Sequence, residues 1–321
     1  MHRHGTRALL VCALPLVLAT GCGDREVALD RQQIVQLFGR EHVVPRAAAP
    51  AELVAFGREL YHDARLSKNG NISCASCHDL ARHGTDGEPK SPGTDGKRGD
   101  RNSPSSVNAF RQVAQFWDGR AADVEAQAQG PVVNPIEHGF ATEAEFEAKL
   151  ASLPGMPERF AALFPGDRPL SLANFGTAVG AFERTLVTTS RFDRWLDGDD
   201  SALTGAEKGG LATFVATGCV ACHAGRTVGG GMFQKLGLVK PYPTDDVGRA
   251  KVTGQAADTH VFKVPMLLGV AETAPYFHDG SVATLEEAVR AMASHQLGKE
   301  LTEAEVLEIV AFLRALSSRD A

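Results

Sequence analysis

The pentapeptides CASCH, Cys74 to His78, and CVACH, Cys219 to His223, decide how this 321-residue chain can fold. Both follow the pattern Cys-x-x-Cys-His, in which two thioether bonds attach a haem and the adjacent histidine ligates its iron. A redox dithiol is the alternative, but a thioredoxin-type site would require a parallel βαβ setting, and this sequence offers helices. Two copies therefore predict two covalently bound haem c groups, held by Cys74, Cys77, His78, Cys219, Cys222 and His223.

The N-terminal residues MHRHGTRALLVCALPLVLATGCGD predict export. A basic head precedes an apolar run, Ala8 to Ala19, which is too short to span a bilayer and fits a signal peptide. Gly21-Cys22 resembles a bacterial lipoprotein cleavage site, although Ala19 stands where leucine is usual. We expect residues 1–21 to be removed and Cys22 to become a lipidated first residue in the periplasm; simple cleavage nearby is the alternative.

Composition limits the class of protein. Apolar residues make up 43% of the chain and aromatic residues 7%, which is typical of a globular protein. The length suffices for two domains with real cores. The formal net charge of −6, without a block of lysine and arginine, gives no electrostatic footprint for nucleic acid. An exported chain could join four cysteines as two disulfides, but the Cys-x-x-Cys-His spacing favours haem.

The patterns along the chain predict a mainly α fold of two cytochrome c-like haem domains with long ordered loops. One helical stripe comprises Leu172, Phe175, Val179, Phe182 and Leu186. Four capping boxes predict helix starts at Thr142/Glu145, Thr204/Glu207, Thr284/Glu287 and Thr302/Glu305. Residues 83–104 and 225–259 are rich in glycine and polar residues and read as long loops. Each half has a helix, a haem motif and a loop, so we place domains at 46–187 and 188–321.

The axial ligands decide whether a haem transfers electrons or reacts with a substrate. His78 is the predicted proximal ligand of the first haem, and we expect His83 to be a solvent-facing loop residue. Met292 shares a helical face with Leu285 and Val289, which by periodicity alone indicates a core methionine.

Longer stretches carry a resemblance to a known family. These are GRELYHDARLS, RNSPSSVNA, QFWDGRAAD, GPVVNPIEHG, CVACH and KVPMLLGVAETAPYFHDGSVATLEEAVRAM. From about Gly57 to the C-terminus the chain resembles the bacterial di-haem cytochrome c peroxidases and their relatives, the MauG proteins. The resemblance implies a low-potential peroxidatic haem in the N-terminal domain and a high-potential electron-transfer haem with His/Met ligation in the C-terminal domain.

The same resemblance implies roles for individual residues. Met292 matches the methionine ligand of the electron-transfer haem, where MauG proteins have tyrosine. Trp117 matches the tryptophan between the haems, and Glu137 matches the distal acid/base, with Pro131 in the same pocket. Three further positions match residues that hold a calcium ion between the domains, namely Asn102, Thr273 and Pro275.

One position departs from the family pattern. Thr94 stands where classical peroxidases keep a removable distal histidine, as is also the case in MauG-like members. We therefore expect the N-terminal haem to be open without prior reduction of its partner. His62 and His83 are unconvincing substitutes, and we assign no ligand role to His138 or His278.

The resulting prediction is a peroxidase that reduces hydrogen peroxide to water with electrons from a small periplasmic cytochrome c or cupredoxin. Two alternatives remain: a MauG-like oxidase acting on residues of a partner protein, and a di-haem electron-transfer protein without catalysis. Family members are often homodimers, which the sequence does not test.

Overall fold

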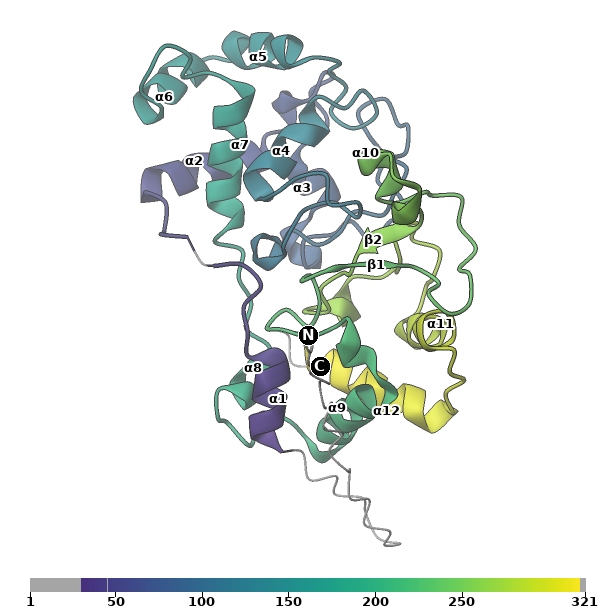
Figure 1. Cartoon of the computed structure of the whole chain (residues 1–321). Helices are drawn as coiled ribbons and strands as arrows, with labels where there is room; N and C mark the ends of the chain where they lie inside the picture. The colour runs from purple at the N-terminus through teal and green to yellow at the C-terminus, as the bar shows by residue number, and fades with distance from the viewer. Residues whose placement is uncertain (1–29, 45, 318–321) are drawn as a thin grey trace, which may run out of the picture.

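The computed structural model describes residues 30–44 and 46–317 and is mainly helical, as predicted. The predicted signal segment and Cys22 lie outside these residues. Figure 1 shows the helices gathered in two groups, with a small pair of strands between them. Within the described part of the chain, no helix is long and apolar enough to cross a membrane.

The first group contains the first haem motif. Its helices are α2 (Ala51–His62), α3 (Cys74–Cys77), α4 (Val124–Val132), α5 (Glu143–Ser152), α6 (Met156–Leu163) and α7 (Leu172–Glu183). Helix α7 packs along both α2 and α4 and lies at the centre of the group (Figure 1). The predicted stripe of α7 is buried from Leu172 to Phe182, and Leu186 follows the helix end. These contacts form one hydrophobic core made entirely of residues from 56 to 182.

The second group contains the second haem motif and has a core of its own. Its helices are α8 (Arg191–Leu196), α9 (Gly205–Thr217), α11 (Leu285–Leu297) and α12 (Glu303–Arg314). The short helix α10 (Ala250–Thr253) belongs to the same half of the sequence but lies across the strands, beside the first group (Figure 1). Helices α9 and α12 pack together closely, which brings Gly210 against the backbone of α12 where any side chain would collide with the Glu308 carbonyl. The antiparallel strands β1 (Phe233–Lys235) and β2 (Val261–Lys263) complete this half.

Helix α1 (Arg31–Phe38) precedes the first group in sequence but packs in the second core. Ile34 and Phe38 are buried there, and the Phe38 ring meets that of Phe192 edge-on at 5.3 Å. The chain after α1 continues this contact, because Gly225 N–H donates to the Leu37 carbonyl and Arg226 N–H to the Arg40 carbonyl. The N-terminal segment therefore packs on the second group of helices, although the first group follows it directly in sequence.

The local predictions had mixed outcomes. Reciprocal capping boxes begin α9, α11 and α12, as predicted. Thr142 caps α5, but Glu145 accepts from the Ala141 N–H and not from the N-cap N–H, so that box is incomplete. The loop predicted over 225–259 is partly wrong, because it contains β1 and α10. Strands of three residues are too short to show an alternating pattern.

Candidate functional site

Each Cys-x-x-Cys-His motif lies in a short helical turn beside a cavity. Cys74 and Cys77 bound α3, and Cys219 begins a 3₁₀ turn that ends at Ala221. Both cysteines and the histidine of each motif line their cavity. The thiols are free, and burial raises the pKa of all four. Raised thiol pKa values disfavour a reactive dithiol, since the thiolate is the reactive form.

The two histidines have closely similar surroundings. Burial lowers the pKa of His78 and lowers that of His223 to about 4, so both rings are neutral, the form that ligates iron. His78 Nδ1 lies 3.3 Å from the Gly84 carbonyl oxygen, and Tyr61 Oη donates to the His78 carbonyl at 2.7 Å. His223 Nδ1 is buried without a partner of normal geometry. Free thiols, neutral imidazoles and adjoining cavities fit two haem c groups.

The segments that follow the two motifs repeat each other in structure at one constant sequence offset. Gln115 pairs with Ala121 across a turn, and Tyr276 pairs with Val282 in the same way. The turn residues correspond: Phe116 and Phe277 have φ of 63° and 68°, and Gly119 and Gly280 have φ of 68° and 65°. Helix α4 begins at Val124 and α11 at Leu285. Residues 102–132 and 263–293 are therefore equivalent in the two halves.

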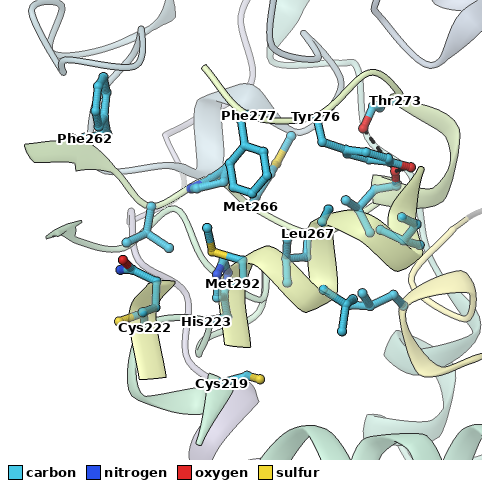
Figure 2. A pocket seen from close by; sticks show the side chains of 18 of the residues that line it. Cys219, Cys222, His223, Phe262, Met266, Leu267, Thr273, Tyr276, Phe277 and Met292 are labelled. Atoms are coloured by element: carbon cyan, nitrogen blue, oxygen red, sulfur yellow. Dashed lines mark hydrogen bonds between the residues drawn. The ribbon is translucent and has the colours of Figure 1, made fainter. Parts of the chain in front are cut away.

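This equivalence aligns Pro131 on α4 with Met292 on α11. Met292 lines the cavity of His223, where Figure 2 shows its side chain among the labelled residues of the pocket. Pro131 lines the cavity of His78. At equivalent positions the C-terminal cavity thus receives a thioether, which can ligate iron, and the N-terminal cavity receives a pyrrolidine ring, which cannot.

The N-terminal cavity, of about 580 Å³, contains the predicted acid/base Glu137. Asn134 Nδ2 donates to Glu137 Oε1 at 2.7 Å and orients the carboxyl group. Burial raises the pKa of Glu137, while the Asn134 hydrogen bond and the Arg120 charge act in the opposite direction. A carboxyl group held in a cavity with a pKa closer to neutrality is suited to accept and return a proton.

Thr94 is buried but does not line this cavity. Its N–H donates to the Glu137 carbonyl at 2.8 Å, and its Oγ1 donates to Asn71 Oδ1 at 2.6 Å. The adjacent Gly93 approaches so closely that a Cβ would lie 1.6 Å from the Ile136 carbonyl oxygen. The loop is therefore fastened against the segment that carries Glu137.

The other three histidines considered for the first haem, His62, His83 and His138, differ in where they lie relative to the N-terminal cavity. Neither His62 nor His83 lines the N-terminal cavity. The prediction that His83 faces solvent is wrong, because its side chain is only 5% exposed. His83 adopts a left-handed conformation at the end of a 3₁₀ turn, and its ring packs against Gly269 of the other half. His138 does line the cavity, and its Nδ1 lies 3.2 Å from the Leu66 carbonyl oxygen.

Trp117 lies in the wall between the two cavities and lines both. Its Nε1 donates to the Asn102 carbonyl at 2.9 Å. Two backbone bonds are reciprocal under the internal repeat: Asn102 N–H donates to the His278 carbonyl, and Lys263 N–H donates to the Trp117 carbonyl. The rings of Trp117 and His278, which occupy equivalent positions, have centroids 6.4 Å apart.

The three residues predicted for calcium all line the C-terminal cavity: Asn102, Thr273 and Pro275. Asn102 Nδ2 donates to the Glu88 carbonyl, which leaves the amide oxygen as a further acceptor. Among the described residues, no group of three or more His, Cys, Asp or Glu side chains could hold a metal ion. A cation here would therefore depend mainly on carbonyl oxygens.

Two buried charged residues were missed by the sequence reasoning. Glu183 lines the N-terminal cavity, and burial together with the charge of Glu125 raises its pKa to about 8. Lys263 lines the C-terminal cavity, and burial lowers its pKa to about 7. In the sequence Glu183 is followed directly by Arg184 and Lys263 is a single charged residue in an apolar stretch, and neither setting indicates a cavity-lining residue.

Comparison with known proteins gives consistent matches. The family model described as di-haem cytochrome c peroxidase matches residues 51–201. The cytochrome c551 peroxidase of Nitrosomonas europaea is 47% identical over 97% of this chain and 92% of its own length. That of Pseudomonas aeruginosa is 41% identical over 97% and 90%. A crystal structure of a MauG-like protein associated with microbial copper homeostasis aligns with a TM-score of 0.73 at 30% identity, over 86% of this chain and 93% of that one.

Proposed function

This chain belongs to the di-haem cytochrome c peroxidase family, and on that premise we propose that it reduces hydrogen peroxide to water with electrons from a small periplasmic cytochrome c or cupredoxin. Two covalently bound haem c groups are characteristic of the family. We assign them to two domains, 46–187 and 188–321, and the two separate hydrophobic cores support that division. The N-terminal haem is the peroxidatic one.

The observation that carries the proposal is the difference between Pro131 and Met292 at equivalent positions. The C-terminal haem has His223 and Met292 available as axial ligands, which suits electron transfer. The N-terminal haem would have His78 as a ligand, whereas Pro131 on α4 offers no ligating side chain and Thr94 in the fastened loop does not line the cavity. That leaves space for peroxide beside Glu137.

When bound, the N-terminal haem supplies the iron that takes peroxide and passes electrons to it. The chain's own contribution is proton transfer. Reduction of one hydrogen peroxide consumes two electrons and two protons and yields two waters. Glu137 accepts the proton of the inner peroxide oxygen and returns it to the outer oxygen, so that water departs and not hydroxide. Asn134 holds the carboxyl group in position through the 2.7 Å bond to Oε1.

Trp117 lies on the route that we propose for electron transfer between the two cavities. Its ring lines both of them, and its Nε1 and carbonyl group are held by Asn102 and Lys263 from the two halves of the molecule. We assign to it the electron transfer from the C-terminal haem to the peroxidatic haem. We also assign Asn102, Thr273 and Pro275 to a calcium ion and Cys22 to a lipid anchor in the periplasm.

A second candidate function is a MauG-like oxidation of residues in a partner protein. The structural match to a MauG-like protein and the threonine at position 94 favour it. Met292 disfavours the oxidase function, because MauG proteins carry tyrosine at the position that matches Met292. A pure electron-transfer protein would have no use for Glu137 in an enclosed polar cavity.

The test begins with the electron paramagnetic resonance spectrum of the oxidised holoenzyme, followed by rapid mixing with peroxide. We expect a high-spin signal that peroxide consumes, and turnover with reduced cytochrome c. Glu137→Gln should keep both haems and lose about 10²–10⁴-fold in turnover, the range for a positioned proton transfer. Glu158→Gln, which changes an exposed glutamate on α6, is the control and should leave turnover unchanged.

The pH profile gives a second readout. Glu137 acts in its ionised form, and its pKa is raised, so wild-type turnover should fall as the pH decreases through that raised pKa. The glutamine variant should lack this acidic limb. Two low-spin haems that do not respond to peroxide, or near-normal turnover by Glu137→Gln, would remove the proposed mechanism.

A further inference from the structure

Lys263 is the one lysine or arginine that lines the C-terminal cavity, and no aspartate or glutamate of the described chain lines it. The side chain ends strand β2 and is only 5% exposed. Its Nζ donates to Gln112 Oε1, a neutral acceptor that is itself buried. Among the described residues, no carboxylate forms an ion pair with it, and its lowered pKa of about 7 has burial as its cause. An ammonium group has three donors, and only one of them is used here.

A buried ammonium without an anion is energetically costly. The cavity around Lys263 is otherwise formed by apolar and neutral groups such as Phe262, Val264 and Leu268. Such an arrangement is stable when the group that fills the cavity brings its own negative charge. Haem does so, because its two propionate side chains are carboxylates at neutral pH.

The internal repeat places Lys263 at a distinctive position. Lys263 is equivalent to Asn102, and its partner Gln112 is equivalent to Thr273. Asn102 and Thr273 are two of the residues that we assign to calcium. Lys263 and Gln112 therefore occupy the positions that the internal repeat relates to Asn102 and Thr273, the pair that we assign to a cation. At the Lys263–Gln112 position the lysine side chain supplies the positive charge that the proposed calcium ion would supply at the Asn102–Thr273 position.

We propose that the Lys263 ammonium binds a propionate carboxylate of the C-terminal haem and raises the reduction potential of that haem. This inference rests on the assignment of haem c to the C-terminal cavity, but not on peroxidase activity. A positive charge near the iron favours the reduced state, which carries one positive charge less. Among the described residues, no carboxylate side chain lines this cavity, so no fixed negative charge of the protein there offsets the rise in reduction potential.

The test is an optical redox titration of the holoenzyme without peroxide, following the absorption of the low-spin C-terminal haem. Lys263→Met removes the charge and keeps most of the side-chain volume. We expect its electron-uptake equilibrium constant to fall about tenfold or more, which for a one-electron couple is a decrease of 59 mV. Lys263→Arg should remain close to wild type. Lys235→Met removes an exposed lysine from neighbouring β1 and should change nothing, because solvent screens that charge.

Lys263→Gln provides an independent variant, since it can still hydrogen-bond to Gln112 but carries no charge. It should lower the potential as Lys263→Met does. If either neutral variant keeps the wild-type potential, with or without a lower melting temperature, the lysine is a packing residue and the proposal is wrong. A normal potential with normal peroxide turnover would overturn this inference alone. A lowered potential supports it even in a protein that proves inactive toward peroxide.

Discussion

The two cavities that we assign to the haems share a backbone plan but differ in size and in the charges that line them. The N-terminal cavity is about 580 Å³ and the C-terminal cavity about 250 Å³. Charged side chains of both signs line the first, namely Asp100, Arg101, Asp118, Arg120, Glu137, Glu183 and Lys251. Among the residues that the structure describes, one lysine, arginine, aspartate or glutamate lines the second cavity, namely Lys263. The same repeat thus forms a polar chamber in one half and a nearly apolar one in the other.

This difference is consistent with the two tasks that we propose for the two halves. Proton transfer to a substrate needs space, an ionisable group of suitable pKa and a partner that orients it, which Glu137 and Asn134 provide. Electron transfer needs a closed site whose ligands do not change, and we propose that Met292, which lines the C-terminal cavity from α11, provides one of them. The two cavities differ at one equivalent helical position, occupied by Pro131 in one half and by Met292 in the other, and we propose that this position separates the two tasks.

The largest effect is expected when the N-terminal cavity is given the ligand of the C-terminal one. Pro131→Met should place a thioether opposite His78, convert the high-spin haem to low spin, and reduce peroxide turnover to the uncatalysed background. Pro131→Ala is the matched control, because it removes the ring without adding a ligand and should keep the high-spin signal. Unchanged spin state and turnover in Pro131→Met would break the equivalence between the two positions.

The reverse experiment opens the C-terminal cavity. Met292→Leu keeps the apolar contacts of α11 but removes the sulfur, so we expect a new high-spin signal and a lower potential. Loss of about tenfold in the electron-uptake equilibrium constant corresponds to 59 mV for one electron. Met266→Leu is the control, since Met266 is the other labelled methionine of the same cavity (Figure 2) and is not the residue that we assign as ligand. A low-spin signal that survives in Met292→Leu would mean that another side chain ligates the iron.

The smallest effect is expected at the fastened loop. Thr94→Val removes the Oγ1–Asn71 hydrogen bond but keeps the shape of the side chain and the backbone bond to Glu137. We expect a loss of about 0.5–1.5 kcal/mol in the free energy of unfolding, because the exposed Asn71 can bind water instead. Peroxide turnover should stay within about twofold. A large loss of turnover at unchanged stability would show that position 94 acts on the substrate.

The features that could be predicted from the sequence are those encoded by local patterns. The stripe of α7 and the reciprocal capping boxes of α9, α11 and α12 depend on residues three or four apart, and they are confirmed. The family resemblance is confirmed by the relatives. The roles of Glu137, Trp117 and Met292 remain predictions, although the structure brings Glu137 to one cavity, Met292 to the other and Trp117 to both.

The features that were missed depend on contacts between distant residues. The His83 ring packs against Gly269 in the other half, and strand β1, which lies in the predicted loop, forms by pairing with β2 beyond the end of that loop. The pKa of Lys263 is lowered by burial, and that of Glu183 is raised by burial together with the charge of Glu125. No local window of the sequence contains that information.

Helix α1 has a consequence for the order of events during biosynthesis. Ile34 and Phe38 are among the first described residues to be synthesised, yet their core consists of residues from 192 onward. Helix α1 can therefore dock only after the C-terminal half of the polypeptide has been synthesised. Docking of α1 thus requires that the C-terminal half has folded. Truncation near residue 190 would leave Ile34 and Phe38 of α1 exposed and the segment sensitive to proteolysis.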